Sequence, residues 1–279
     1  MFYSNISIHI EINNQFNKIF LPFAKELYAR IINLGLNCQM FWGYKESNSK
    51  KIILGAHSNP EYWLNKLNPE DIIVNFEPIY KDSWRDMNPN YLELLKRQCV
   101  YDYCEINLPY LEESYFFKMP PLYSDLKPKR KKELDVIFIG SMNNYRRDIL
   151  RKLHKTGINI KAKFNILDDE LYNEIDGARI YLNLDLDKES IFNEFRLMSC
   201  AQTNTLFAGH SGNIEFHPLA EKLVGLSIFK NDSEMIDGIR SLIFDDNSFL
   251  KAFDIQNEFA SENKMRFDDF IIQQFSAAA

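Results

Sequence analysis

Apolar residues recur along the chain in two alternating patterns, and this alternation predicts an α/β fold. Short apolar runs such as residues 71–75 and 135–139 have the length and composition of strands that are buried on both faces. In residues 16–34, apolar side chains instead return every three or four positions, which is typical of an amphipathic helix, and Gly35 ends it. The two patterns alternate from residues 4–12 to residues 226–229, and such alternation favours parallel sheets.

Residues 120–132 break this alternation and indicate a boundary between two domains. The segment contains three prolines and the basic run Lys127–Lys132. We therefore expect an N-terminal domain over residues 1–125, a linker over 126–133 and a C-terminal domain over 134–279. Charged linkers are usually solvated, although contact with a phosphate-rich acceptor is an alternative for this one. Two separate helices, over residues 248–258 and 263–274, are expected to end the chain.

The stretch over residues 134–147 carries the clearest chemical signal. An apolar strand ends at Gly140, a turn follows from Ser141, and a helical pattern begins behind it. This arrangement directs backbone N–H groups at the start of a helix towards an anion. Arg146 and Arg147 add positive charge in the first helical turn, where the helix dipole would favour carboxylates. An ordinary strand–helix turn with solvated arginines is the alternative, because neither a GxGxxG nor a Walker pattern is present.

Composition and charge limit the classes of function. The 279 residues carry a net charge of −6, which does not favour stable binding of nucleic acid. The four cysteines are scattered, so we expect reduced thiols rather than a disulfide framework or a zinc site. No signal peptide and no apolar run of about 20 residues is evident, so we expect a cytoplasmic protein, with contact to the inner face of the membrane left open.

Several stretches resemble the CgeB-like, group 1 glycosyltransferases of bacteria. In the second half they are Val136–Arg147, residues 180–184, residues 193–197, residues 207–210 and residues 229–233. In the first half they are residues 73–79, Trp84, Tyr91, residues 100–103 and Asn107. The resemblance therefore covers nearly the whole chain, through short motifs.

This resemblance implies a GT-B-like fold, in which two Rossmann-like domains face a central cleft and helices end the chain. It also implies a hexosyl- or pentosyltransferase that moves a sugar from a nucleotide-diphosphate donor to a hydroxyl of a glycan, a lipid-linked or another acceptor, as in cell-surface polysaccharide or glycolipid synthesis. The C-terminal domain would hold the donor. No cofactor beyond this donor substrate is implied.

The resemblance also implies the donor-binding residues. Gly140, Ser141, Arg146 and Arg147 match the loop that lies against the donor diphosphate. A glutamate of these proteins bonds the ribose, and either Glu194 or Arg196 occupies its place here. The glycine common in the following turn is missing.

Candidates for a catalytic base come from the ends of the predicted strands in the first half. Ligands of open α/β sheets lie beyond the carboxyl ends of strands. Those ends carry Glu11, His57, Glu77 and Asp102, each able to take a proton from a hydroxyl. His57 is the most accessible, because Gly55 and Ala56 precede it. A base is required only if the reaction inverts the anomeric centre, and a structural role is the alternative for each residue.

Metal-dependent and non-enzymatic functions are the alternatives. His210, Glu215 and His217 match no common zinc spacing, and the DxD sequence at residues 185–187 belongs with a different glycosyltransferase architecture. We therefore expect metal-independent transfer. A catalytically silent binding or regulatory subunit with the same fold is the main alternative, and a two-lobed small-ligand binding protein is a weaker one.

Overall fold

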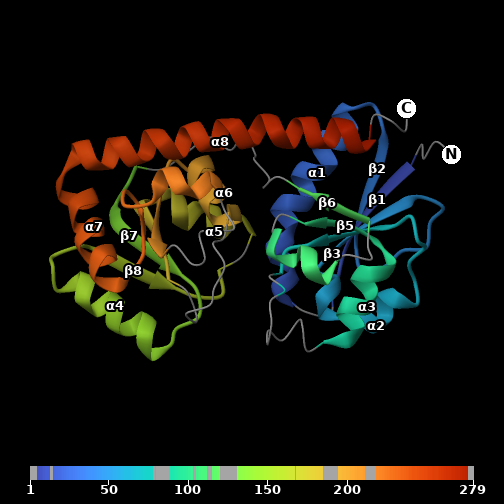
Figure 1. Ribbon diagram of the computed structural model, residues 1–279, viewed down its shortest axis with the longest axis horizontal. Helices are drawn as coiled ribbons and strands as arrows, with labels where there is room; N and C mark the ends of the chain where they lie inside the picture. Colours follow the sequence, from blue (N-terminus) through green and yellow to red (C-terminus); the bar gives the residue numbers. More distant parts are fainter. Residues whose placement is uncertain are drawn as a thin grey trace. The chain divides into compact units, whose positions relative to one another are not determined.

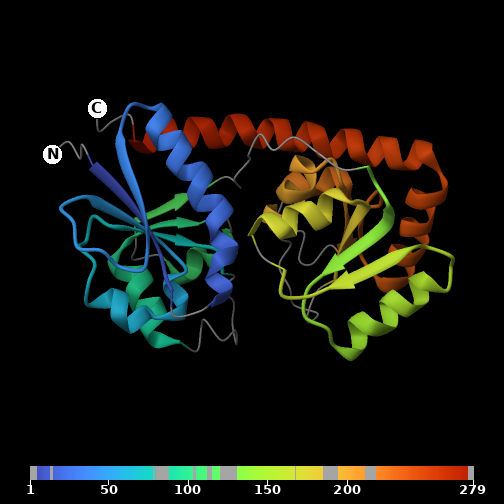
Figure 2. The same ribbon diagram turned by 180° about the vertical axis from the view of Figure 1, so that it is seen from behind.

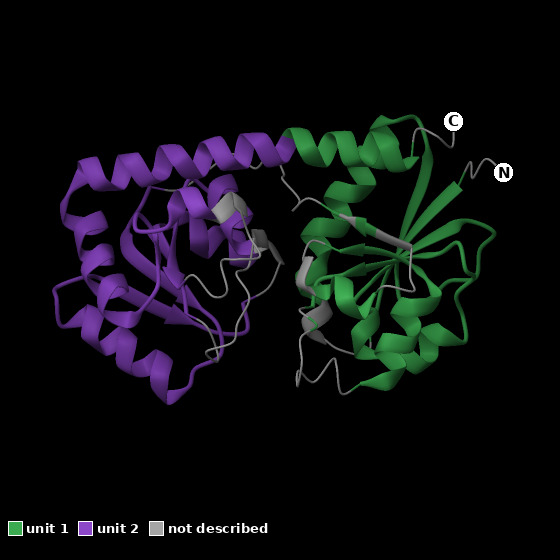
Figure 3. Cartoon of the chain, viewed as in Figure 1, with its two compact units in different colours: residues 1–120, 265–279 green, residues 121–264 purple. Residues whose placement is uncertain are grey.

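The computed structural model contains two parallel β-sheets, one in each half of the chain (Figure 1). It describes residues 5–12, 15–77, 79, 88–102, 105–111, 115–119, 131–166, 168–184, 194–210 and 218–275. The chain divides into unit 1, Met1–Pro120 with Met265–Ala279, and unit 2, Pro121–Lys264 (Figure 3).

Unit 1 contains a parallel sheet with the strand order β2-β1-β3-β4-β5-β6. The strands are β1 Asn5–Ile10, β2 Asn37–Trp42, β3 Lys50–Leu54, β4 Ile72–Asn75, β5 Cys99–Asp102 and β6 Tyr115–Lys118. The helices are α1 Leu21–Asn33, α2 Pro60–Leu64 and α3 Pro89–Arg97, with 3₁₀ turns η1 Gln15–Phe20, η2 Ala56–Ser58 and η3 Glu105–Tyr110.

The apolar runs of the sequence form the buried strands of this sheet. Ile53, Ile73 and Val100 lie on one face and pack with Trp63 of α2 and Tyr91 of α3. Helix α1 packs on β1 and β2 and lies in front of the sheet in Figure 2. Strand β6 was not predicted, because no turn signal separates it from the aromatic segment before it.

Unit 2 contains a second parallel sheet, with the order β11-β10-β9-β7-β8. Its strands are β7 Leu134–Ile139, β8 Ile160–Lys163, β9 Ala178–Asn183, β10 Leu206–His210 and β11 Ile228–Phe229. Its helices are α4 Asn144–His154, α5 Asp168–Asp176, α6 Glu194–Gln202 and α7 Asp232–Phe244, with a 3₁₀ turn η5 at Pro218–Leu223 and the start of α8, Asp246–Phe275.

Both faces of the second sheet are covered, which explains the continuous apolar runs of its strands. Val136 and Phe138 of β7 face a core formed with α4 and α7. Ile137 and Ile139 face the other core, formed with α5, α6 and α8. Successive residues of one strand thus enter different cores, as the alternation of a strand requires.

Helix α8 changes the expected domain boundary at the end of the chain. One continuous helix replaces the two predicted ones, and its residues from Met265 onward belong to unit 1 rather than to the C-terminal domain. In unit 2, Gln256 of α8 bonds the backbone of β10. In unit 1, the aromatic rings of Phe270 and Tyr101 lie 5.0 Å apart, and Asp268 pairs with Arg30 of α1. The expectation of two helices was wrong because both apolar patterns fit a single unbroken helix.

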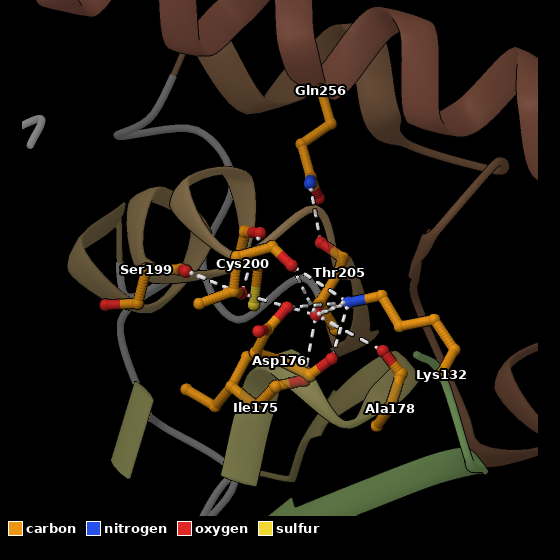
Figure 4. Close-up of polar contacts among 9 residues, drawn as sticks. Lys132, Ile175, Asp176, Ala178, Ser199, Cys200, Thr205 and Gln256 are labelled. Carbon is orange, nitrogen blue, oxygen red and sulfur yellow. Dashed lines mark hydrogen bonds and ion pairs between the residues drawn. The ribbon is translucent and has the colours of Figure 1, made fainter. Parts of the chain in front are cut away.

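The basic run around Lys132 suggested a solvated linker residue, but the structure shows Lys132 bonded to unit 2. Figure 4 shows its ammonium group directed at the amino ends of β9 and β10. Nζ donates to the backbone oxygens of Asp176 and Thr203 at 2.9 and 2.8 Å and to Thr205 Oγ1 at 2.9 Å. Burial lowers the pKa of Lys132, and the nearby Asp176 carboxylate opposes that shift. The lysine therefore ties the beginning of unit 2 to its sheet. Residues 126–130 of the expected linker lie outside the described part.

Three of the four cysteines belong to the described part of the chain. Cys38 and Cys200 are buried, Cys99 is partly buried, and all three are free. Burial raises the pKa of Cys99 to about 11 and that of Cys38 to about 12. Among the helices that the structure describes, none is long and apolar enough to cross a membrane.

Candidate functional site

The first candidate site lies in unit 2, where the strand order reverses. Strands β7 and β9 are neighbours, and from their carboxyl ends the chain continues in opposite directions across the sheet, from β7 to β8 and from β9 to β10. Open parallel sheets bind ligands in the crevice at such a switch point. The turn from Gly140 to Asn143 and the end of β9 at Asn183 and Leu184 form this edge.

Arg146 lies at the switch point, but its guanidinium group is bonded to the protein. The residue is 5% exposed. Nε and Nη2 donate to the backbone oxygen of Leu184 at 3.1 and 2.5 Å, and Nη1 donates to the backbone oxygen of Ser141 at 2.6 Å. Arg146 therefore joins the turn after β7 to the end of β9. It places a positive charge at the site, while a direct contact with an anion stays a prediction.

Gly140 and Ser141 serve this arrangement. A Cβ at Gly140 would approach the Phe138 ring to 3.2 Å, so glycine leaves room for this ring, over which the guanidinium carbon of Arg146 lies 5.4 Å from the centroid. Ser141 is exposed, and its Oγ accepts from Arg146 Nη1 at 3.2 Å. Asn143 Oδ1 accepts the N–H of Arg146 at 2.8 Å and thereby caps α4.

Arg147 and Arg196 differ in their surroundings. Arg147 is exposed, and its Nη1 donates to Asn144 Oδ1 at 3.2 Å. Arg196, in α6, donates to the side-chain oxygen of the buried Asn183 at the end of β9. The side chain of Glu194 lies outside the described part. Of the two candidates for the ribose contact, Arg196 is therefore the one that the structure locates at the switch point.

The buried hydroxyl of Tyr181 lies near both arginines. Its hydroxyl donates to the backbone oxygen of Ile139 at 3.4 Å. Burial raises the pKa of Tyr181, while the positive charges of Arg196 and Arg146 both act to lower it. Both guanidinium groups are thus close enough to the ends of β7 and β9 to act on the Tyr181 hydroxyl.

The second candidate site lies at the carboxyl edge of the unit 1 sheet. Its switch point is between β1 and β3, where Glu11 and His57 follow the two strands. Glu11 is buried. His57 Nε2 lies 3.6 Å from Glu77 Oε1, with side-chain exposures of 13% and 19%. This histidine–carboxylate pair can accept a proton and remains accessible to a ligand.

Asp102 is completely buried, so it differs in kind from His57 and Glu77. Its Oδ2 accepts from Asn75 Nδ2 at 2.7 Å and from Asn107 Nδ2 at 2.8 Å. The same two amide groups donate to the backbone oxygen of Glu77, and Asn75 Oδ1 accepts the Glu77 N–H at 3.1 Å. The three predicted residues are therefore brought together, with Asp102 as the buried anchor of a network that fixes Glu77.

Sequence reasoning did not propose Asn75, Tyr91 and Asn107 as site residues. Tyr91 donates to Asn75 Oδ1 at 2.5 Å and completes the network. All three residues stand in the stretches that carry the family resemblance, and this was the available signal. Amide and phenol groups do not suggest a catalytic base, and these residues act instead by holding Glu77 in place.

A metal site was also considered among the residues that the structure describes. No cluster of three or more histidine, cysteine, aspartate or glutamate side chains with suitable geometry occurs there. His210 instead contacts Tyr145 and Asp232. Glu215, His217 and the DxD sequence at residues 185–187 lie outside the described residues.

Comparisons with known proteins relate the chain to others through structure. No protein-family model and no curated protein matches the sequence. The solved structures it resembles include T4 phage BGT, a β-glucosyltransferase, in complex with UDP and Mn²⁺, at 17% identity and TM-score 0.62 over 98% of this chain and 99% of that one.

Two further structures have similar coverage. An α-glucosyltransferase in complex with UDP-glucose and DNA matches at 10% identity and TM-score 0.60, over 98% of this chain and 99% of that one. HepE of Anabaena, in complex with UDP-glucose, matches at 10% identity and TM-score 0.56, over 98% of both chains. At these identities the likeness establishes the fold alone. The chain has a GT-B fold, with two Rossmann-like α/β domains and C-terminal helices.

Proposed function

We propose that this protein is a glycosyltransferase that moves a sugar from a nucleotide-sugar donor to an acceptor hydroxyl. One observation carries the proposal: the guanidinium groups of Arg146 and Arg196, from α4 and α6, both reach the end of β9 at the switch point of unit 2. Fixed positive charge at that point of a parallel sheet suits the diphosphate of a nucleotide sugar. The fold shared with structures solved with UDP-glucose supports the proposal.

The chemistry of transfer explains the need for this charge. The bond between the anomeric carbon and the β-phosphate oxygen breaks, and negative charge develops on that oxygen. Positive groups already fixed in place stabilise this charge without reorganising. The N-terminal end of α4, with its dipole, lies at the same turn and acts in the same direction.

We propose that this transfer needs no metal ion, since the two arginines supply positive charge. T4 phage BGT was solved with Mn²⁺ beside UDP, so the point needs its own test. Turnover that persists in excess EDTA would support metal independence. Turnover that requires added Mn²⁺ would contradict it.

For the acceptor we propose His57 as the general base. Its imidazole would take the proton of the attacking hydroxyl, and the Glu77 carboxylate at 3.6 Å would stabilise the imidazolium that forms. Glu77 is held through its backbone by Asn75 and Asn107. Asp102 is completely buried and would act through this network rather than on the acceptor.

The class of acceptor follows from two different considerations. A glycan or lipid-linked hydroxyl at the inner face of the membrane agrees with the net charge of −6, because the chain has no basic surplus for holding nucleic acid. A second candidate is DNA with hydroxymethylated bases, which offer the hydroxyl that ordinary bases lack. The names of two matched proteins favour it: a DNA-modifying β-glucosyltransferase and an α-glucosyltransferase bound to DNA.

The deciding experiment combines binding and turnover. Purified protein is screened by thermal shift against UDP-, GDP-, ADP- and CMP-sugars, where ligand at 100 times Kd adds about 2.7 kcal/mol of stability. The sugar that binds is then supplied in labelled form with a lipid-linked glycan fraction and with hydroxymethylated DNA. Label in either acceptor supports a transferase and identifies its acceptor class. Donor binding without transfer or hydrolysis would instead support a catalytically silent subunit, and absence of any nucleotide binding would overturn the proposal.

A further inference from the structure

A second polar cluster lies at the carboxyl edge of the unit 2 sheet, apart from the arginines. Tyr145 comes from the first turn of α4, His210 ends β10, and Asp232 begins α7. Three elements that are distant in sequence thus contribute one side chain each. The edge at which they meet is the edge where open parallel sheets bind ligands.

The hydrogen bonds of the cluster converge on one carboxylate oxygen. Tyr145 O–H donates to Asp232 Oδ1 at 2.7 Å, and His210 Nε2 lies 2.9 Å from the same oxygen. The rings of Tyr145 and His210 are stacked, with centroids 6.2 Å apart. Within the described part of the chain, no residue bonds the second oxygen, Oδ2, and the Asp232 side chain is 43% exposed. The cluster therefore presents an oriented carboxylate oxygen beside an imidazole and a phenol.

A close packing of backbones brings His210 to this place. Residue 209 is glycine, and a Cβ there would lie only 2.2 Å from the backbone oxygen of Asn183. Glycine therefore lets the end of β10 approach the end of β9. His210 is the next residue, and its ring contacts Tyr145 of α4 and Asp232 of α7.

The charge of the cluster indicates what it can bind. A carboxylate repels a phosphate, so the anionic part of a ligand belongs with Arg146 and Arg196. Uncharged hydroxyl groups suit an oriented carboxylate, because a hydroxyl donates its proton to a carboxylate oxygen. Tyr145 and Arg146 are consecutive residues, about 3.8 Å apart at their Cα atoms, so one bound molecule can reach both.

We infer that Tyr145, His210 and Asp232 form a subsite for the hydroxyl groups of the donor's sugar. The inference rests on the proposed function, and it assigns specificity for the sugar to Asp232 in particular. Asp232 Oδ2 accepts hydrogen bonds from the sugar hydroxyls, while His210 and Tyr145 fix the orientation of the carboxylate through Oδ1.

Isothermal titration of the full chain tests the subsite. Kd is measured for UDP and GDP alone and for their glucose, galactose and mannose esters. We expect Asp232→Asn to weaken the best sugar ester at least tenfold and the matching free nucleoside diphosphate less than twofold. Tyr145→Phe keeps the ring and removes the hydroxyl, so it should shift the same ratio in the same direction. Asp237→Asn, an exposed aspartate on the same helix, is the control and should change neither Kd.

The outcomes separate the two proposals. Equal weakening of ester and free nucleotide by Asp232→Asn, with an unchanged melting temperature, would overturn the sugar subsite and leave the proposed function intact. An unchanged ratio in both variants would overturn it as well. If the unaltered protein binds none of these nucleotides or esters, nor ADP- or CMP-sugars, the donor proposal fails and the subsite fails with it.

Discussion

The side-chain oxygen of Gln256 accepts the backbone N–H of Phe207 at 2.7 Å, and its Nε2 donates to the backbone oxygen of Thr205 at 2.8 Å. A helix residue thus pairs with β10 in the way a neighbouring strand would. Gln256 is completely buried, so no water can replace either bond. Truncation to alanine leaves two buried polar groups unsatisfied, at about 1–3 kcal/mol each.

We therefore expect Gln256→Ala to lower the melting temperature by several degrees, at about 2–4 °C per kcal/mol for a chain of this size. Differential scanning calorimetry measures it. Gln273→Ala, on an exposed position of the same helix, should change the melting temperature very little. Equal melting temperatures for the two variants would show that the Gln256 bonds do not contribute to stability.

A second prediction concerns pH and His9. This buried histidine contacts Gly43 O at 3.1 Å and Ser7 Oγ at 2.9 Å, and burial lowers its pKa below the ordinary 6.5. Below pH 6.5, His9 therefore binds a proton in the unfolded chain but not in the folded chain. The stability contribution of His9 is complete above pH 6.5 and is lost as the pH falls towards the lowered pKa, by at most about 1.4 kcal/mol per pH unit.

We expect His9→Gln to reduce the dependence of unfolding free energy on pH between 7 and 5, whatever it does to stability at pH 7. Urea denaturation at several pH values provides the slope. His154→Gln, at an exposed position, is the control and should retain the slope of the unaltered protein. A slope that is the same in all three proteins would contradict the role of His9.

A third prediction separates catalysis from support in unit 1. His57→Gln should retain the melting temperature and donor binding but lose transfer by about 10²–10⁴-fold, as expected for a positioned base. Asp102→Ala should lower the melting temperature, because two buried amide groups lose their acceptor, at about 1–3 kcal/mol. Full turnover in His57→Gln would mean that the base lies elsewhere or that the reaction retains the anomeric configuration, which NMR of the product would distinguish.

A fourth prediction compares the arginines of unit 2. Arg196→Met removes a charge located at the end of β9 and should weaken nucleoside diphosphate binding by about 10- to 150-fold, the value of 1.5–3 kcal/mol for a charge-assisted bond. Arg147→Met should have a smaller effect, because Arg147 is exposed and bonded to Asn144. Calorimetric titration decides between them, with the exposed Arg240→Met as the control for net charge. A larger loss for Arg147 would reverse the two assignments.

The sequence was sufficient to predict the parts of the fold that depend on local pattern. Strands such as β7 were evident because both of their faces are buried, and the turn and helix after Gly140 were evident from the change of pattern. Contacts made after folding were not evident. Lys132 was expected in a solvated linker because its neighbours are basic, yet its ammonium group bonds two backbone oxygens that come from 44 and 71 residues further along.

The candidate sites divide in the same way. Strand ends are predictable, so His57, Glu77 and Asp102 could be proposed together. The difference in their exposure could not be predicted, because it depends on the side chains of Asn75 and Asn107, which both donate to Asp102. The pairing of Tyr145 with His210 was equally hidden, because it joins residues 65 positions apart.

Helix α8 has a consequence for the order in which the protein is made. The part of α8 from Met265 onward supplies Phe267 and Phe270, both buried in unit 1, while the strands of that unit are encoded more than 140 residues earlier. A ribosome thus releases the sheet of unit 1 long before the helix that completes its core. The strands β7 to β11 of unit 2 are synthesised between these two parts of unit 1. Unit 1 is thus begun first and completed last during synthesis, so an interruption of translation near the end leaves out Phe267 and Phe270 and exposes the apolar surface that they cover.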